Sequence, residues 1–321
     1  MPEVRFDVVP GLLPVLVDEL AERGLPVTAS GDAWATAAVG DLRAALEVRT
    51  AYAAYAAVTF AVPRPKALLG DANLRQIHAA VADVLALHRP GSFAGLRLSA
   101  AGAGTPVMRR LAASMADAAG LPVDDDDGDL LVRVVPSWQV LIRLTPRPLS
   151  DRPWHVPGFE GALDASVAAA MVRLSRPRPD DVFLDPTCGS GTIAVERARH
   201  GPAAAVLAGD IDVDALVAAW RNGAAGPLLL ADAASVPLRA GSVTALAANP
   251  PWGHRFEADD AFGGALLAEA GRVAVPGARF AVLTHDVRRF ERAVRDQARW
   301  HVEQQLRLDL RGHHPRLYVL V

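Results

Sequence analysis

The chain has 321 residues, of which 51% are hydrophobic and 21% charged, and its formal net charge is −3. This length suffices for two or three cores, and the composition excludes a disordered or fibrous chain and a protein that coats nucleic acid by bulk positive charge. The single cysteine, Cys188, excludes an internal disulfide and a cysteine-based zinc site. The apolar stretches are shorter than the roughly 20 residues that span a bilayer, so we expect a cytoplasmic chain with no membrane partner. We also expect no bound metal.

The first half of the sequence predicts an α+β arrangement. Short apolar runs alternate with stretches of helical spacing, and a proline-containing connector at 62–65 separates two groups of elements. The expected strands are 5–9, 34–38, 53–60, 94–98, 130–135 and 139–144, and the expected helices are 12–23, 42–48, 74–88 and 107–119. The proline- and aromatic-containing stretch 146–159 is interpreted as a linker, so we expect domains at 1–62, 63–148 and 149–321.

The second half has a more regular alternation of strand and helix with short links, which predicts an α/β fold with a doubly wound, mainly parallel sheet. The expected strands are 181–184, 204–208, 228–231, 243–248, 279–283, 305–310 and 317–321, and the expected helices are 192–200, 213–222, 259–273 and 287–299. The last two strands lack a helix between them, so we expect the sheet to end in an antiparallel pair. Ligands bind such sheets at the carboxyl ends of the strands.

A glycine-rich turn, Asp185-Pro-Thr-Cys-Gly-Ser-Gly-Thr192, follows one predicted strand and opens the next helix. Such a turn brings the backbone close to a ligand, and a dinucleotide such as NAD is one candidate. Asp185 would repel a pyrophosphate but suits the cationic amino acid end of S-adenosylmethionine. The Gly-Lys-Ser/Thr ending of an ATP-binding loop is missing from the sequence. The residues expected to bind S-adenosylmethionine here are Asp185, Pro186, Cys188, Gly189, Ser190, Gly191 and Thr192.

Acidic residues also follow the next two predicted strands. Asp210, beside Ile211, is placed to accept hydrogen bonds from ribose hydroxyls, and Asp232, beside Ala233, is placed to meet an adenine amino group. An aspartate that closes a strand is often a cap or turn residue. Three of them after three successive strands favour a cofactor site.

The sequence Asn249-Pro250-Pro251-Trp252 follows the fourth predicted strand of this half, where the methyl group would emerge. Two prolines stiffen the loop, so that the Asn249 side-chain oxygen and the Pro250 carbonyl can both accept hydrogen bonds from one planar amino group. Trp252 offers a flat face on which a flipped base can stack. These four residues are the predicted catalytic set, and Asn249 is also expected to border the cofactor. Catalysis would consist mainly of positioning.

Three motifs together resemble the THUMP-associated class I RNA methyltransferases that form N2-methylguanosine: Asp185 to Thr192, Gly209-Asp-Ile-Asp212, and Asn249-Pro-Pro-Trp-Gly-His-Arg255. The stretch from Arg152 into a helix at 165–174 is similar to the start of the catalytic domain in that family. The resemblance implies a Rossmann-like class I methyltransferase domain preceded by ferredoxin-like and THUMP-like modules. It also implies a structured RNA substrate, with tRNA favoured over rRNA.

Several alternatives stay open at this point. The acceptor could be adenine N6 or a protein glutamine amide, since all share the Asn-Pro-Pro loop, or the chain could be a non-catalytic RNA-binding factor. The family's usual aromatic after Asn-Pro-Pro is Tyr or Phe, whereas this chain has Trp252. Arg255 is expected either to touch a phosphate of the substrate or to pair with Glu257. The sequence predicts no oligomeric state.

Overall fold

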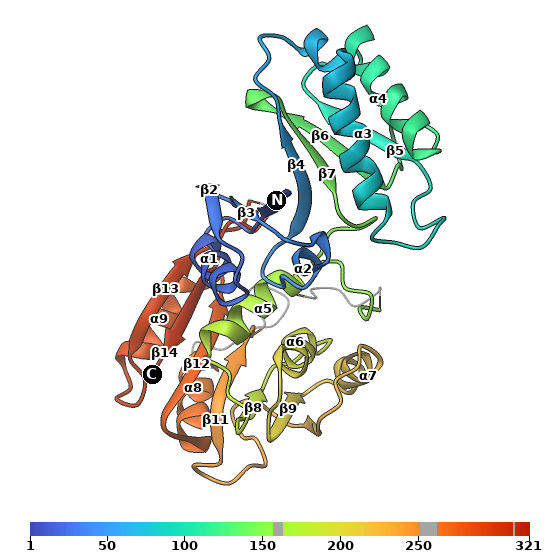
Figure 1. Ribbon diagram of the computed structural model, residues 1–321. Helices are drawn as coiled ribbons and strands as arrows, with labels where there is room; N and C mark the ends of the chain where they lie inside the picture. The colour runs from blue at the N-terminus through green and yellow to red at the C-terminus, as the bar shows by residue number, and fades with distance from the viewer. Residues whose placement is uncertain (157–162, 251–261, 311) are drawn as a thin grey trace. The chain divides into compact units, whose positions relative to one another are not determined.

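The computed structural model describes residues 1–156, 163–250, 262–310 and 312–321 (Figure 1). The chain divides into two compact units. Unit 1 consists of Met1–Val8 with Leu16–Ser150, and unit 2 of Val9–Val15 with Asp151–Val321. Helix α1 (Leu13–Glu22) begins in unit 2 and ends in unit 1. The finer division of the first half at residue 62 stays a prediction.

Unit 1 is built on a seven-stranded sheet in the order β2-β3-β1-β4-β7-β6-β5, antiparallel except for the parallel pair β5 and β6. Its strands are β1 (Glu3–Asp7), β2 (Val27–Gly31), β3 (Trp34–Ala38), β4 (Ala53–Thr59), β5 (Leu96–Ala100), β6 (Leu130–Val135) and β7 (Gln139–Arg143). Its helices are α2 (Leu42–Leu46), α3 (Asp71–Leu85) and α4 (Pro106–Ala119), with short 3-10 turns η1 (Pro65–Leu69) and η2 (Pro136–Trp138). Helices α3 and α4 pack on each other and on β4, β5 and β7.

Local sequence explains where α4 begins and ends. The Thr105 hydroxyl accepts a hydrogen bond from the Met108 N–H, Pro106 occupies the first turn, and Gly120 ends the helix in the left-handed conformation. Strand β2 was not expected from the sequence. Four of its five residues are exposed, because it is an edge strand, so it lacks the apolar alternation by which a strand is recognised.

Unit 2 contains a second seven-stranded sheet, in the order β10-β9-β8-β11-β12-β14-β13. Its strands are β8 (Val182–Asp185), β9 (Ala205–Asp210), β10 (Leu228–Leu230), β11 (Val243–Ala248), β12 (Ala274–Thr284), β13 (Val302–Arg307) and β14 (Arg316–Leu320). Its helices are α5 (Ala165–Leu174), α6 (Thr192–His200), α7 (Val213–Arg221), α8 (Phe262–Val273) and α9 (Val287–Arg295). The first five strands of this order are parallel, and β14 is antiparallel to both β12 and β13. The predicted doubly wound sheet with an antiparallel end is confirmed.

Two apolar clusters cover the two faces of this sheet. Leu207 belongs to the cluster formed with α8 and α9, whereas its neighbour Ala208 belongs to the cluster formed with α6 and α7. Successive residues of a strand point to opposite faces, so helices pack on both sides. A sheet covered on both faces leaves its strand ends as the accessible edge for a ligand.

Helix α9 ends four residues earlier than the sequence predicted. The Gln297 side chain closes a turn there, because its oxygen accepts hydrogen bonds from the N–H groups of Arg299 and Trp300 at 2.6 and 2.8 Å. Its nitrogen donates to the Val294 carbonyl oxygen at 2.8 Å. Apolar periodicity continues through this turn, since Trp300 is also buried, so periodicity alone did not reveal the break.

Candidate functional site

The three predicted acids lie at one edge of the unit 2 sheet. Asp185 is the last residue of β8, Asp210 is the last residue of β9, and Asp232 follows the end of β10 by two residues. The strands are parallel neighbours, with Asp185 opposite Ala208 and Leu230 opposite Asp210. Their carboxyl ends therefore meet along one edge, as the sequence predicted.

The turn from β8 into α6 has the tight backbone that its glycines allow. Gly189 and Gly191 both have positive φ angles, of 50° and 78°, and Gly191 directly precedes α6. The Cys188 N–H donates to the Gly209 carbonyl oxygen at 2.8 Å, which ties the turn to the next strand. A Cβ atom on Gly191 would lie 2.7 Å from the Cβ of Ala219, so α7 approaches too closely for any side chain there.

Asp210 holds this turn in place through its side chain. One carboxylate oxygen accepts a hydrogen bond of 2.8 Å from the Gly189 N–H, and the other accepts one of 3.0 Å from the Asp212 N–H. Ile211, which lies between Asp210 and Asp212 in the sequence, is an exposed apolar residue, 71% accessible, at the same strand end. A carboxylate beside an uncovered aliphatic side chain suits a ligand with both hydroxyl groups and a flat apolar ring.

Asp185 is the most unusual residue of the edge. Its side chain is fully buried, and one carboxylate oxygen accepts a hydrogen bond of 3.3 Å from the Thr187 N–H. The other oxygen, Oδ2, has no hydrogen-bond partner among the described residues. Burial, and secondarily the charge of Asp210, raise the pKa of Asp185 well above its usual value. A buried acceptor without a partner fits a cationic ligand group that would supply the missing hydrogen bond.

The Cys188 thiol of this turn is poorly suited to act as a nucleophile or a metal ligand. The thiol is buried, and burial together with the charges of Asp185 and Asp210 raises its pKa above the usual value. The thiolate is the nucleophilic and metal-binding form, so a thiol held protonated is inert. Among the described residues, no group of three or more His, Cys, Asp or Glu side chains could hold a metal ion.

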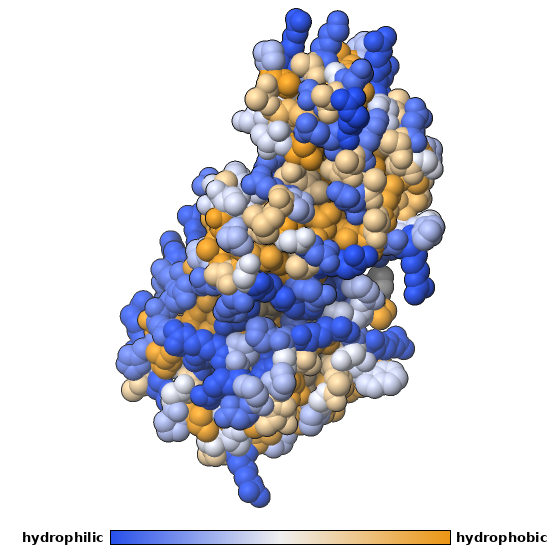
Figure 2. All heavy atoms as spheres, in the orientation of Figure 1, coloured by the Kyte–Doolittle hydropathy of each residue, from blue (hydrophilic) through white to orange (hydrophobic). Residues whose placement is uncertain are grey.

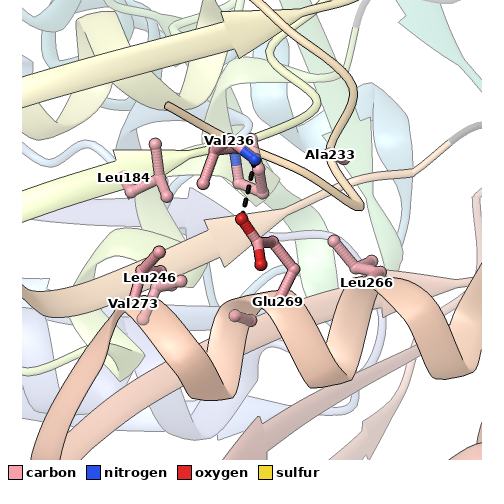
Figure 3. Close-up of a pocket in the computed structure, with 9 residues that line it drawn as sticks. Leu184, Ala233, Val236, Leu246, Leu266, Glu269 and Val273 are labelled. Atoms are coloured by element: carbon pink, nitrogen blue, oxygen red, sulfur yellow. Dashed lines mark hydrogen bonds between the residues drawn. The ribbon is translucent and has the colours of Figure 1, made fainter. Parts of the chain in front are cut away.

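Asp232 is exposed, and it lies in a loop that a helix on one face of the sheet holds in place. Its carboxylate accepts a hydrogen bond of 2.8 Å from the Ala234 N–H. Two residues further on, the Val236 N–H donates to the Glu269 carboxylate of α8 at 2.7 Å (Figure 3). The Glu269 carboxylate also forms an ion pair with Arg272, and this pairing lowers the pKa of Glu269. Glu269 therefore positions the loop, and no motif of the sequence analysis included it.

Asn249 and Pro250 lie at the same edge, on the other side of β8. They follow β11, which pairs with β8 through Leu246 and Leu184 and with β12 through Ala248 and Val282. The strand order reverses between β8 and β11, which is the switch point at which open α/β sheets bind ligands. The structure thus brings Asn249 to the edge that carries Asp185. Pro251, Trp252 and Arg255 lie outside the described residues.

Asn222, at the end of α7, supports the turn from outside and was missed by the sequence analysis. Its side-chain nitrogen donates to the Ser190 carbonyl oxygen at 2.8 Å, and its oxygen accepts from the Val156 N–H at 2.7 Å. The stretch before α5 is anchored similarly, because Arg152 and Glu196 of α6 form a buried ion pair of 2.9 Å. An asparagine after a helix is usually a cap, so the sequence carried no signal for this bridge.

Comparison with solved structures gives a likeness over the whole chain. TrmN from Thermus thermophilus is 28% identical with a TM-score of 0.77, and the match covers 100% of this chain and 99% of that one. SMU.472, solved in complex with SAH, is 15% identical with a TM-score of 0.65 and shows the fold alone.

Curated relatives are similar over shorter stretches. A tRNA (guanine(6)-N2)-methyltransferase of Thermus thermophilus is 36% identical over 190 residues, 56% of each chain. A tRNA (guanine(6)-N(2))-methyltransferase THUMP3 of Bos taurus is 29% identical over 180 residues, which are 49% of this chain and 36% of the relative. The chain thus spans about half, or less, of the curated relatives it matches.

The sheet order of unit 2 and its likeness to TrmN define a class I methyltransferase fold. Residues 152–316 match the family described as UPF0020, RMKL-like methyltransferase domain, and they make up just over half of the chain. The chain belongs to this family.

Proposed function

We propose that this chain is an S-adenosylmethionine-dependent RNA methyltransferase that forms N2-methylguanosine in tRNA. The observation that carries the proposal is the buried Asp185 oxygen that has no hydrogen-bond partner among the described residues, at the sheet edge where Asn249 and Pro250 also lie. A cation-binding position and an amino-group-binding position then stand on either side of the switch point. Two relatives are named tRNA guanine-N2 methyltransferases, and they support guanine N2 of tRNA as the methyl acceptor.

The donor set fits S-adenosylmethionine. Asp185 would hold the amino acid end, with Pro186 and the turn residues Cys188 to Thr192 around it. Asp210 would bind the ribose hydroxyls, and Ile211 would pack against the adenine. Asp232, with Ala233 beside it, would meet the adenine amino group. When bound, the cofactor supplies an electrophilic methyl group.

Asn249 and Pro250 would position the acceptor. Two acceptor oxygens, the Asn249 side-chain oxygen and the Pro250 carbonyl, can each accept a hydrogen bond from one exocyclic amine and orient its lone pair. A buried Pro250 at the end of a strand paired on both sides gives that geometry a rigid base. Stacking of the base on Trp252, completion of the loop by Pro251, and a phosphate contact from Arg255 remain parts of the proposal.

Unit 1 would grip the RNA as the THUMP-like part of the chain. A hollow of about 550 Å³ on its sheet is lined in part by Tyr55, Arg97 and Arg133. Arg133 pairs with Asp7 at 2.6 Å, while Arg97 donates to the Asp126 carbonyl oxygen at 3.0 Å. An aromatic ring among arginines suits a nucleotide.

The acidic run from Asp124 to Asp127 forms a turn held by its own hydrogen bonds, in which the Asp124 carboxylate accepts from the N–H groups of Asp126 and Asp127.

The decisive experiment is nucleoside mass spectrometry of tRNA and rRNA from a deletion strain, together with methyl transfer by the purified chain. We expect N2-methylguanosine to disappear from tRNA in the strain and to form on an unmodified tRNA transcript in vitro. Loss of the modification from rRNA alone would identify rRNA, not tRNA, as the substrate. If the product were N6-methyladenosine or methylated glutamine, the acceptor would be adenine N6 or a glutamine amide instead of guanine N2. An unchanged modification profile, with no transfer in vitro, would overturn the enzymatic proposal.

Asn249→Ala is the variant that separates catalysis from RNA binding. It should bind S-adenosylhomocysteine and tRNA while losing methyl transfer. Asn73→Ala is the matched control, because Asn73 is likewise half-buried but donates to the Ala67 carbonyl oxygen in unit 1. A non-catalytic RNA-binding factor would show no transfer in any of these proteins. We also propose a cytoplasmic location. Among the described residues, no helix is long and apolar enough to cross a membrane.

A further inference from the structure

Helix α9 carries a stripe of arginines on its outer face. The helix sequence is VRRFERAVR, with four arginines and one glutamate. Arg288, Arg292 and Arg295 are all exposed. At about 100° per residue these positions fall within roughly 60° of one another, while the buried Phe290 and Val294 lie on the opposite side. The outer side of this helix is thus uniformly basic along about 10 Å.

The other charges of the helix are already neutralised. The Glu291 carboxylate pairs with Arg316 at 2.8 Å and accepts a hydrogen bond from the Tyr318 hydroxyl at 2.8 Å. Arg289 pairs with Asp286 at 3.3 Å. No ion pair joins Arg288, Arg292 or Arg295 to any described residue, although Glu291 and the C-cap residue Asp296 lie next to them in the sequence. Three positive charges are left facing solvent.

Helix stability explains only part of this stripe. Arg292 and Arg295 lie in the last turn, where positive charge interacts favourably with the helix dipole. Arg288 lies in the first turn, where positive charge is unfavourable. Its neighbour Arg289 pairs with Asp286, whereas Arg288 forms no ion pair with any residue that the structure describes. An arginine in the first turn of a helix, with no ion-pair partner in the described part of the chain, points to a role in binding.

The stripe begins at the edge of the sheet that carries the candidate site. Helix α9 follows β12, whose Val282 is paired with Ala248, the residue before Asn249. Strand β13 is parallel to β12, because both are antiparallel to β14, so α9 runs from the carboxyl edge back to the other edge. Arg288 is therefore the member of the stripe nearest to the acceptor side. In Figure 2 the part of unit 2 that carries α9 and β13 is largely hydrophilic.

No other described helix of unit 2 is comparable. Arg197 of α6 and Arg272 of α8 are held in ion pairs, with Asp181 and Glu269. Helices α6 and α7 each carry one further exposed arginine, Arg199 and Arg221, at the end away from the site. The concentration of unpaired positive charge on α9 is therefore a local feature of a chain whose formal net charge is −3.

We propose that Arg288, Arg292 and Arg295 of α9 form a phosphodiester-binding surface of the catalytic unit, which holds the RNA strand beside the methylated nucleotide. This inference rests on the proposed function and adds the place at which unit 2 itself contacts the RNA backbone. Guanidinium groups bind phosphate by charge-assisted hydrogen bonds, and such contacts position a nucleic acid without reading its sequence.

The test uses the full chain and an unmodified tRNA transcript. The variant Arg288→Gln/Arg292→Gln/Arg295→Gln removes the charge and keeps a long helix-forming side chain. Each phosphate contact contributes roughly 0.7–0.9 to the slope of log affinity against log salt concentration. We expect the slope to fall by about 2, and tRNA affinity at 0.1 M salt to fall roughly 10- to 100-fold. The KM for tRNA should rise, while kcat at saturating tRNA and affinity for S-adenosylhomocysteine stay unchanged.

A matched control removes three other exposed arginines of unit 2, as Arg199→Gln/Arg221→Gln/Arg239→Gln. It should keep the wild-type salt slope, and the single variant Arg288→Gln should show the largest individual effect on KM. A wild-type slope in the stripe variant, or an equal loss in the control, would overturn the inference while leaving the proposed function standing. Wild-type protein that binds no RNA would overturn both. An acidic protein partner for the stripe would show as unchanged RNA binding.

Discussion

The Asp210 carboxylate accepts a hydrogen bond of 2.8 Å from the backbone N–H of Gly189, so the end of β9 holds the turn that follows β8. The same side chain would bind ribose in the proposed site. It thus joins two motifs that are about twenty residues apart in the sequence, and one substitution tests both roles.

Asp210→Ala removes the acceptor for the N–H groups of Gly189 and Asp212 as well as the proposed ribose contact. Hydrogen bonds to a charged group contribute about 1.5–3 kcal/mol. We expect the Kd for S-adenosylhomocysteine to rise roughly 10- to 150-fold, measured by calorimetry. Asp210→Asn keeps one acceptor oxygen and should lose less. Unchanged affinity in the alanine variant would exclude the ribose role.

Asp185 should make the free protein less stable as pH rises. Its pKa is raised in the folded chain, mainly by burial, so the folded state binds more protons than the unfolded state above the ordinary carboxyl pKa of about 3.9. The free energy of unfolding then decreases as pH rises through that window toward the folded pKa. Asp185→Asn should therefore raise the Tm at pH 7.5 more than at pH 4, in thermal melts without ligand. A variant that melts lower than wild type at pH 7.5 contradicts this account.

Cofactor binding should release a proton over the same window. A ligand ammonium beside Asp185 favours the carboxylate and lowers its pKa from the raised value of the free protein. Affinity for S-adenosylhomocysteine should increase with pH until Asp185 is ionised in the free protein. Calorimetry in two buffers of different ionisation enthalpy measures the proton count directly. Asp185→Asn should bind weakly and show no such proton release.

Gly191 is required by both its backbone and its surroundings. Alanine at a φ of 78° costs roughly 1–2 kcal/mol, and its Cβ would lie 2.7 Å from the Ala219 Cβ, which adds about 1–3 kcal/mol of overpacking. Gly241 has a φ of 63° with no atom within 4 Å of a built Cβ, so Gly241→Ala carries the backbone cost alone. Urea unfolding of both variants should place Gly191→Ala clearly below Gly241→Ala. Equal losses would show that α7 can move away.

Asp181 pairs with two arginines of very different exposure. Arg197 is fully buried and bonds the Asp181 carboxylate at 3.3 Å, whereas Arg178 is 60% exposed and lies 3.5 Å away. Removing one member of a buried pair costs about 3–5 kcal/mol, but an exposed pair is screened by solvent and contributes less than about 1 kcal/mol. Arg197→Met should lower the free energy of unfolding far more than Arg178→Met. Similar values in urea titrations would disprove the distinction.

Much of the architecture of unit 2 followed from the sequence. The bounds of β11 and α6 were predicted to the residue, because buried runs and helical periodicity are strong there. The antiparallel end of the sheet followed from the missing helix between its last two strands. Strand β2 was missed because an exposed edge strand has no apolar pattern, and the end of α9 was missed because Gln297 closes a turn through side-chain hydrogen bonds.

The candidate site likewise has features that the sequence predicted and features that only the tertiary structure revealed. The sequence by itself determined that Asp185, Asp210, Asp232 and Asn249 come at or just after the ends of strands in one parallel sheet, and such strand ends share an edge. The tertiary structure decided which carboxylate oxygens have a hydrogen-bond partner, because burial and hydrogen bonding depend on neighbours that are distant in the chain. Oδ2 of Asp185 has no partner among the described residues, whereas both carboxylate oxygens of Asp210 accept a hydrogen bond. It also decided the roles of Glu269 and Asn222, whose contacts lie more than thirty residues away. The unpaired face of α9 likewise emerged only when Arg289 and Glu291 were seen to be paired.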